Sequence, residues 1–167
     1  MNPANSLVEL PVLTPQGKFL ARYSNTGLAE LDFPSARESK RASSRKPFPA
    51  SVRRWHRATT TALKQSLAGQ NPGHLPPLDL SGGTAFQQCV WRTLRKISMG
   101  RTKSYGEIAR AIGKPKAVRA VGGACGANPI PVLVPCHRVL AANRKLGGFS
   151  GGLDWKRTLL AGEGVEI

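Results

Sequence analysis

The chain has 167 residues, of which 40% are hydrophobic, enough for a packed core and too many for a chain disordered throughout. Lys and Arg number 25 against nine Asp and Glu, a net charge of +16, and this excess predicts nucleic acid as the partner. No apolar run approaches the roughly 20 residues of a membrane helix, and the N-terminus lacks the basic-then-apolar order of a signal peptide. We therefore expect a soluble intracellular protein.

The first half of the sequence predicts a small sheet followed by a helix. Residues 7–32 alternate short apolar runs with good turn formers, which is typical of a β-meander. Residues 34–49 are polar, basic and bracketed by prolines, and predict a loop. A helix is expected over 50–68, where apolar residues share one stripe, and a short strand over 78–80.

The second half predicts three consecutive helices and, after a glycine-rich loop at residues 147–152, a final amphipathic helix that bears Leu153, Trp155, Leu159 and Leu160. Thr84 can cap a helix whose apolar stripe continues to Ile97. The capping-box pattern of residues 104–107 opens a second helix, which Gly113 stops. Pro115 suits the first turn of a third helix. The second and third helices indicate either a helix-turn-helix or an ordinary helical hairpin, and the pattern does not choose between them.

The third predicted helix is unusually rich in small residues, which destabilise a helix where they are glycines. Either another helix packs against this surface, or the surface lies against a duplex. Arg119 is a long cation within it, and is either one more surface arginine or a side chain that reaches into a groove or the base stack. The small residues are Ala117, Ala120, Gly122, Gly123, Ala124 and Gly126.

The cysteines are odd in number and have no CxxC spacing, which argues against a disulfide framework and against a zinc site built on paired cysteines. Cys89 falls on an apolar helical stripe and Cys125 in the small-residue helix. We expect both to be buried structural cysteines.

Cys136 is different, because His137 follows it directly. The apolar, β-prone run 130–134 should be buried and leads the chain to this pair. Consecutive side chains of an extended segment point to opposite faces, so the pair needs a turn or a bridging water to act together. A carboxylate behind the imidazole would fix its tautomer. Spacing leaves four candidates open: Glu107, Asp154, Glu163 and Glu166.

Four stretches together carry a family resemblance: "SYGEIA…PKAVRAVGGA", "NPIPVLV", "PCHRV" and "GGFSGGLDWKRTLLAGEG". From about Phe86 to Gly164 the sequence resembles the O6-alkylguanine-DNA alkyltransferases, also called methylated-DNA–protein-cysteine methyltransferases. The resemblance implies an α/β (α+β) fold. Residues 1–83 would form a small ribonuclease-H-like αβ domain, and residues 84–167 a mainly helical domain with a helix-turn-helix and the active-site cysteine loop.

The resemblance also implies a function, a DNA repair protein that flips O6-alkylguanine out of the duplex and takes up the alkyl group irreversibly. Cys136 would be the acceptor. His137 would act as its base through a water, with Glu163 as the carboxylate behind it. Asn128 would brace the turn, and Tyr105 would donate a proton to the guanine ring.

Further positions match the family's DNA-binding and pocket residues. Arg119 would fill the gap left by the flipped nucleotide. Phe149 stands where many members carry tyrosine, so the pocket shape should survive while a hydroxyl contact is lost. DNA contacts are implied for Lys116, Ala117, Ala120, Gly122 and Gly123. The base pocket would be lined by Val139, Ser150, Phe149, Lys156 and Pro131.

The implied partner is the minor groove of double-stranded DNA carrying an alkylated guanine, bound by a monomer. No cofactor is expected, and no metal, since the N-terminal half has no cysteine. The location would be the nucleoid-associated cytoplasm of a prokaryote or the nucleus of a eukaryote. The alternatives are a non-catalytic lesion-binding relative, a helix-turn-helix regulator, and a cysteine hydrolase that turns over repeatedly.

Overall fold

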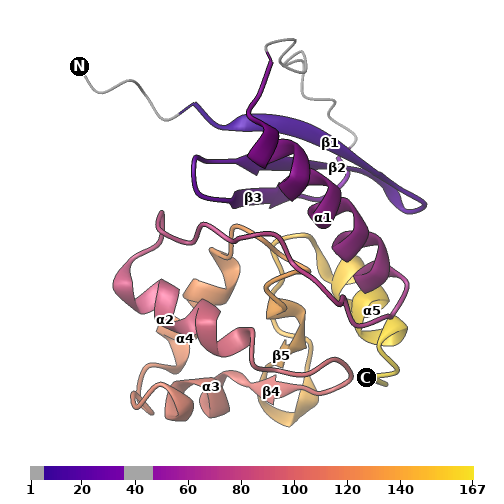
Figure 1. Cartoon of the computed structure of the whole chain (residues 1–167). Coiled ribbons are helices and arrows are strands. Elements are labelled where there is room, and N and C mark those ends of the chain that lie inside the picture. Colours follow the sequence, from indigo (N-terminus) through magenta and orange to yellow (C-terminus); the bar gives the residue numbers. More distant parts are fainter. Residues whose placement is uncertain (1–5, 36–46) are drawn as a thin grey trace.

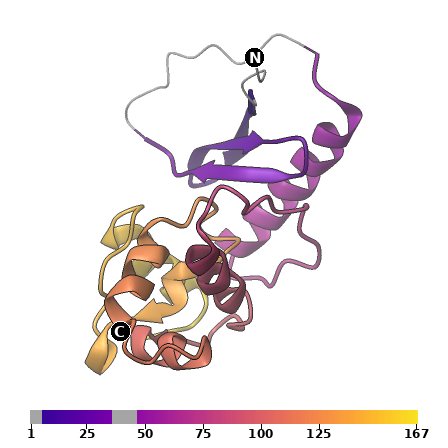
Figure 2. The same cartoon turned by 90° about the vertical axis from the view of Figure 1, so that its left-hand side faces the viewer.

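A computed structural model describes residues 6–35 and 47–167. The chain forms an upper part, in which helix α1 lies against a three-stranded sheet, and a lower part of shorter helices (Figure 1, Figure 2). This mixed architecture confirms the expected fold class. Most of the predicted basic loop over 34–49 lies outside the described residues. The division into two domains after residue 83 and the ribonuclease-H-like shape stay predictions.

The N-terminal meander is confirmed. Strands β1 (Val8–Thr14), β2 (Gly17–Tyr23) and β3 (Leu28–Asp32) pair antiparallel in that order. Alternate residues of a strand point to opposite faces, so β2 buries Phe19 in the core while Arg22 lies on the other face. There the Arg22 guanidinium forms ion pairs with carboxylates of both neighbouring strands.

Helix α1 (Ala50–Leu67) was predicted almost to its ends. Its stripe buries Val52 and Leu63, and the chain leaves the helix at Gly69, whose φ of 72° favours glycine.

The edge strand β1 contains Pro11, which has no N–H to donate to a further strand.

Backbone hydrogen bonds join strand β3 to the lower part of the molecule. The N–H of Leu28 donates to the carbonyl oxygen of Pro77 at 2.8 Å, and the N–H of Leu31 donates to that of Pro129 at 2.9 Å. The strand predicted over 78–80 was wrong, because Leu78 makes an isolated bridge to β3 that does not extend into a ladder.

Helix α2 (Ala85–Leu94) begins as predicted, with the Thr84 side chain accepting from the backbone of the first turn. It ends earlier than the apolar stripe suggested, because the N–H of Ile97 donates to the carbonyl oxygen of Leu94, three residues back, and this bond forms a tighter turn after the helix. The prediction that Cys89 is buried was also wrong. The buried face of α2 is formed by residues 90, 91 and 94, and Cys89 is exposed.

The next two helices have the predicted order but not quite the predicted start. Helix α3 (Tyr105–Ala111) opens with the expected capping box, and Gly113 follows it at a φ of 73°. Helix α4 (Val118–Gly126) begins after Pro115, not at it. The residues around this proline form a separate turn, closed by the Ala117 N–H on the carbonyl oxygen of Lys114, and this turn sets the start of α4.

The apolar run 130–134 is buried as expected, but its predicted β character was wrong. Val132 has a φ of 74°, a left-handed conformation that a β-branched residue rarely adopts, and the run turns back on itself. The chain then makes the short 3-10 helix η1 (Cys136–Arg138) and strand β5 (Val139–Leu140). Strand β5 pairs in parallel with β4 (Lys103–Ser104), which precedes α3.

The C-terminal helix was predicted correctly. A short 3-10 turn, η2 (Ala142–Arg144), and a glycine-rich loop over 147–152 lead into α5 (Leu153–Gly162), which buries Leu159 and Leu160. Within the part of the chain that is described, no helix combines the length and the apolar character needed to cross a bilayer.

Candidate active site

Cys136 is the first residue of η1 and is 4% exposed. Its N–H donates to the carbonyl oxygen of Val134 at 2.8 Å, which closes a tight bend just before the cysteine. The sequence required either a turn or a water for Cys136 and His137 to act together, and the chain does turn here.

Asn128 holds the loop that leads to this turn. Its Nδ2 donates to the carbonyl oxygen of Val134 at 2.8 Å, and its Oδ1 accepts from the N–H of Ile130 at 3.0 Å. Both contacts are buried, and buried backbone groups need such partners. The side chain therefore closes the loop around Val132, at the bracing position that the family resemblance implied.

Glu163 is the carboxylate that the fold brings to His137. Its Oε1 lies 2.8 Å from His137 Nε2, and both side chains are almost fully buried. Arg138 donates to the same carboxylate from Nε and from its terminal nitrogen, and its other terminal nitrogen donates to the carbonyl oxygen of Ile97. The N–H of Gly100 completes the set at 3.2 Å.

The charge state of this network follows from its contacts. Burial by itself raises the pKa of Glu163, but hydrogen bonds from His137 and Arg138 outweigh it and lower the pKa to about 2. An ionised carboxylate can only accept, so the ring proton of His137 belongs on Nε2. Burial lowers the pKa of His137, which keeps the ring neutral. Nδ1 then carries the basic lone pair, and it has no hydrogen-bond partner among the described residues.

The Cys136 thiol needs such a base. Burial raises the pKa of Cys136, while the Asn128 amide and the charge of Lys156 act in the opposite direction. Lys156 is fully buried, and its Nζ donates to the carbonyl oxygens of Val139 at 2.8 Å and Gly148 at 3.2 Å. The thiol is therefore protonated at rest and close to a fixed positive charge.

A cavity of about 330 Å³ opens onto Cys136. Burial and the two neighbouring cysteines raise the pKa of Tyr105 to about 12, so its hydroxyl keeps its proton. Cys125 was missed as a site residue, although it shares a helix face with Gly122 and Gly126, which was the available signal. The walls are formed by Tyr105, Gly122, Cys125, Gly126, Gly148 and Phe149.

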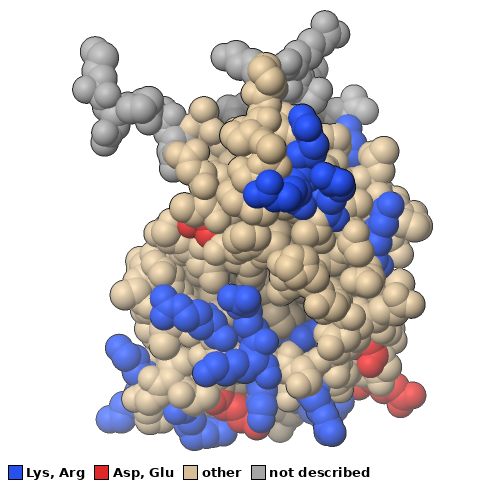
Figure 3. All heavy atoms as spheres, viewed as in Figure 1, with Lys and Arg blue, Asp and Glu red and all other residues tan. Residues whose placement is uncertain are grey.

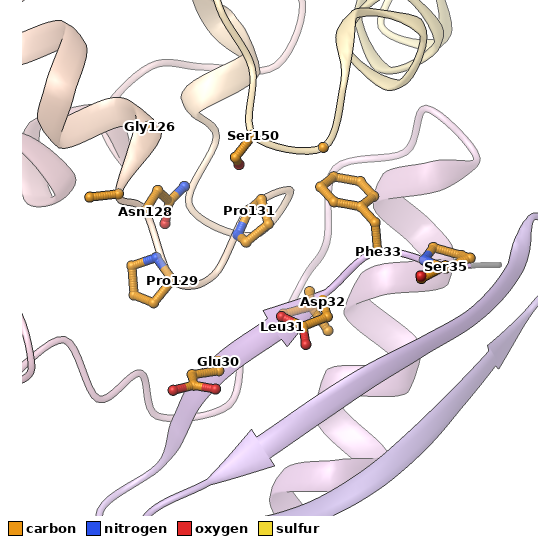
Figure 4. Close-up of a pocket in the computed structure, with 13 residues that line it drawn as sticks. Glu30, Leu31, Asp32, Phe33, Ser35, Gly126, Asn128, Pro129, Pro131 and Ser150 are labelled. Atoms are coloured by element: carbon orange, nitrogen blue, oxygen red, sulfur yellow. The ribbon is translucent and has the colours of Figure 1, made fainter. Parts of the chain in front are cut away.

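The predicted pocket residues divide between two places. Phe149 lines the cavity beside Cys136, whereas Ser150 and Pro131 line a neighbouring cavity of about 580 Å³ between β3 and the loop that follows α4 (Figure 4). Val139 and Lys156 are buried, line neither cavity, and are joined by a hydrogen bond from Lys156 Nζ to the Val139 carbonyl oxygen. Ser150 would reach a bound base only if its loop turned toward the first cavity.

The predicted DNA-contacting residues lie on and around α4. Arg119 and Lys116 are exposed, and side chains added at Gly122 or Gly123 would meet no neighbouring atoms. Among the described residues no helix packs against these two glycines, so this side of α4 is open, whereas Ala124 of the same helix is buried and its carbonyl oxygen accepts from the Trp91 indole. Ala117 is half-buried as the N-cap residue, and Ala120 is exposed.

The surface around these helices is strongly basic. Between residues 85 and 126 the only carboxylate is Glu107, and Lys and Arg gather over this region at the lower left of Figure 3. All nine cations of the stretch are exposed: Arg92, Arg95, Lys96, Arg101, Lys103, Arg110, Lys114, Lys116 and Arg119.

Comparison with known proteins agrees with this site. A family model described as "6-O-methylguanine DNA methyltransferase, DNA binding domain" matches residues 85–165. The crystal structure of Mycobacterium tuberculosis OGT in complex with DNA superimposes with a TM-score of 0.73 at 39% identity, covering 92% of this chain and 90% of that one.

The chain belongs to the methylated-DNA–protein-cysteine methyltransferase family.

Curated methyltransferases of this name show the same relationship. The Haemophilus influenzae protein is 59% identical over 78 residues, 47% of this chain and 44% of that protein. The Mycolicibacterium paratuberculosis protein is 52% identical over 108 residues, 63% of this chain and 65% of that protein. The matches thus span about half to two thirds of the length of these curated methyltransferases. The match to the family model, residues 85–165, contains Cys136, His137 and Glu163.

Proposed function

We propose that the protein repairs DNA by transferring the alkyl group of an O6-alkylguanine irreversibly to its own Cys136. The observation that carries this proposal is the buried network in which Glu163 orients His137 next to a cysteine that opens onto a cavity. A thiol used in packing alone would need neither the cavity nor the oriented base.

DNA binding is assigned to the basic surface of α2, α3 and α4. Its nine exposed cations suit phosphates, and the free glycine face of α4 allows a close approach to the minor groove. The alkylated oxygen is out of reach inside stacked DNA, so the nucleotide must swing out at a cost of a few kcal/mol. Arg119 would enter the stack in its place and offset part of that cost.

The chemical step is a displacement at carbon. His137 takes the thiol proton on Nδ1, directly or through a water, and the Cys136 sulfur attacks the alkyl carbon in line with the guanine oxygen. A carbon–sulfur bond forms as the carbon–oxygen bond breaks, and its electron pair leaves with guanine. Tyr105 protonates the guanine ring and regains a proton that originates from the thiol, so the products are guanine and a neutral thioether.

A single turnover follows from this chemistry. Removing the alkyl group from the thioether would require the cysteine thiolate to leave from an unactivated carbon, and the groups described around Cys136 include no activated nucleophile that could attack that carbon. The alkyl group therefore stays on the protein.

The test is incubation with a duplex that contains one O6-methylguanine, followed by peptide mass mapping. We expect one methyl group per molecule, located on Cys136. A Cys136→Ala variant should bind the duplex and transfer nothing. Binding without transfer by the natural chain would instead indicate a lesion-binding protein or a regulator, and repeated release of product would indicate a hydrolase.

A further inference from the structure

An aromatic cluster connects the N-terminal sheet to the wall of the cavity beside Cys136. Phe33 follows β3, and its ring centroid lies 5.7 Å from that of Phe149, with the rings inclined at 70°. Phe33 also lies 5.0 Å from Trp155 of α5 and 5.5 Å from Phe19 of β2. It is therefore the ring through which this cluster touches Phe149, and Phe149 lines the cavity.

The contact extends to the backbone of the glycine-rich loop over 147–152. A side-chain carbon added at Gly151 would fall 2.5 Å from the Phe33 ring, so glycine is required for the loop to approach so closely. Figure 4 shows the Phe33 ring pointing from the end of β3 toward the part of this loop that carries Ser150.

Other parts of the loop are held from the C-terminal half of the chain. Lys156 Nζ binds the carbonyl oxygen of Gly148 at 3.2 Å, and Gly147 lies directly against the Tyr105 hydroxyl. These contacts fix the start of the loop. Phe33 meets its far end, around Phe149 and Gly151, and it does so from the N-terminal half.

We propose that Phe33 is a positioning residue that fixes the ring of Phe149 and thereby sets which alkyl groups the cavity accepts. This inference rests on the proposed alkyl transfer. An edge-to-face partner favours one orientation of Phe149. With that partner removed, the ring can swing away from Cys136, so the cavity gains room for a bulky group and holds a methyl carbon less firmly in line with the sulfur.

The test compares Phe33→Leu with the matched control Phe19→Leu. Phe19 belongs to the same cluster and contacts Phe33 and Trp155, so its loss disturbs the cluster without removing the ring that touches Phe149. Single-turnover rates are measured on duplexes with O6-methylguanine and O6-benzylguanine. We expect the benzyl-to-methyl ratio to rise about threefold to tenfold in Phe33→Leu, the range that one aromatic pair can supply, and to stay unchanged in Phe19→Leu.

Two further variants keep the outcome decisive. In a Phe149→Leu background, replacing Phe33 should no longer change the ratio, because the ring that it positions is gone. Phe33→Met, whose flexible side chain fills gaps, replaces the Leu variant if that one fails to fold. A folded Phe33 variant with the natural ratio, or an equal shift in Phe19→Leu, overturns the proposal.

A measurement without DNA separates this inference from the proposed function. Cys136 is labelled with iodoacetamide or with bulky N-ethylmaleimide and quantified by peptide mapping, with the exposed Cys89 as internal reference. Phe33→Leu should speed the bulky reagent relative to the small one at Cys136 and leave Cys89 unchanged. If the natural protein takes no alkyl group from DNA, the proposed function fails while this experiment still decides the role of Phe33.

Discussion

At the scale of single residues, the arrangement around His137 defines a proton acceptor. Glu163 accepts from Nε2, and Arg138 holds Glu163 ionised. The imidazole is neutral and its Nδ1 is free to accept a proton. This arrangement requires three ionisable side chains, those of His137, Arg138 and Glu163, to be buried together. Such a network is stable when every member is paired and costly when one is removed.

The lowered pKa of His137 makes a prediction about pH. Alkyl transfer should not decline until the pH falls below 6.5, the ordinary value for histidine, because the buried ring stays neutral to lower pH. Stability should decline over the same acidic range: the unfolded chain binds a proton on His137 below 6.5 and the folded chain does not. Single-turnover rates and urea unfolding as functions of pH check both statements. Transfer that quickens on acidification would contradict the assignment of His137 as base.

At the scale of elements, the starts of two helices were predictable because an N-cap residue and a capping box depend on residues within three positions of each other. Thr84 and Ser104 therefore gave the correct starts of α2 and α3. The run before Cys136 was not predictable in this way. Its residues favour a strand, and the contacts that fold it into a turn come from the Asn128 side chain and from the backbone conformation at Val132.

The partner of His137 shows the same limit. Glu163 lies 26 positions further along the chain, and its approach depends on the packing of α5. Spacing alone left four carboxylates, and only the family resemblance selected Glu163.

Cys125 is a residue that the sequence could have indicated and that was missed. Its small neighbours on α4 could have indicated a cavity before the fold was known.

Helix α4 allows a prediction in which one substitution raises the stability of the protein and weakens its binding to DNA. Gly123 is exposed and helical, and an added side-chain carbon meets no neighbour, so Gly123→Ala should stabilise the protein by about 0.5–1 kcal/mol. If this face lies against a duplex, the same variant should weaken DNA binding. Gly162→Ala in α5 is the control, because its site is also open. Urea unfolding and fluorescence anisotropy report the two effects, and unchanged DNA affinity in Gly123→Ala would place the duplex elsewhere.

At the scale of the whole molecule, the net charge of +16 is distributed unevenly. Residues 85–126 contain nine exposed cations and a single carboxylate, that of Glu107, which accepts from the Ser104 N–H in the capping box of α3. The field of this surface should draw a duplex toward α4 before any base is recognised.

This distribution predicts a steep dependence of DNA binding on salt. With about six phosphate contacts, affinity should fall roughly a thousandfold between about 50 and 200 mM salt. Lys116→Gln should reduce the slope of the logarithmic plot by about one. Arg157→Gln is the control, since Arg157 is exposed on α5 beside Asp154. Equal slopes for the natural chain and Lys116→Gln would remove Lys116 from the interface.

Pro11 has a consequence for how molecules behave at high concentration. It stands in the outermost strand, where an open row of amides would otherwise recruit the same strand of a second copy. A proline at that point leaves a gap in the row, and the growth of intermolecular sheets is interrupted at its first step. If each molecule is consumed by one alkyl transfer, as proposed, the activity must be renewed by fresh synthesis, and newly made chains that resist aggregation suit that renewal.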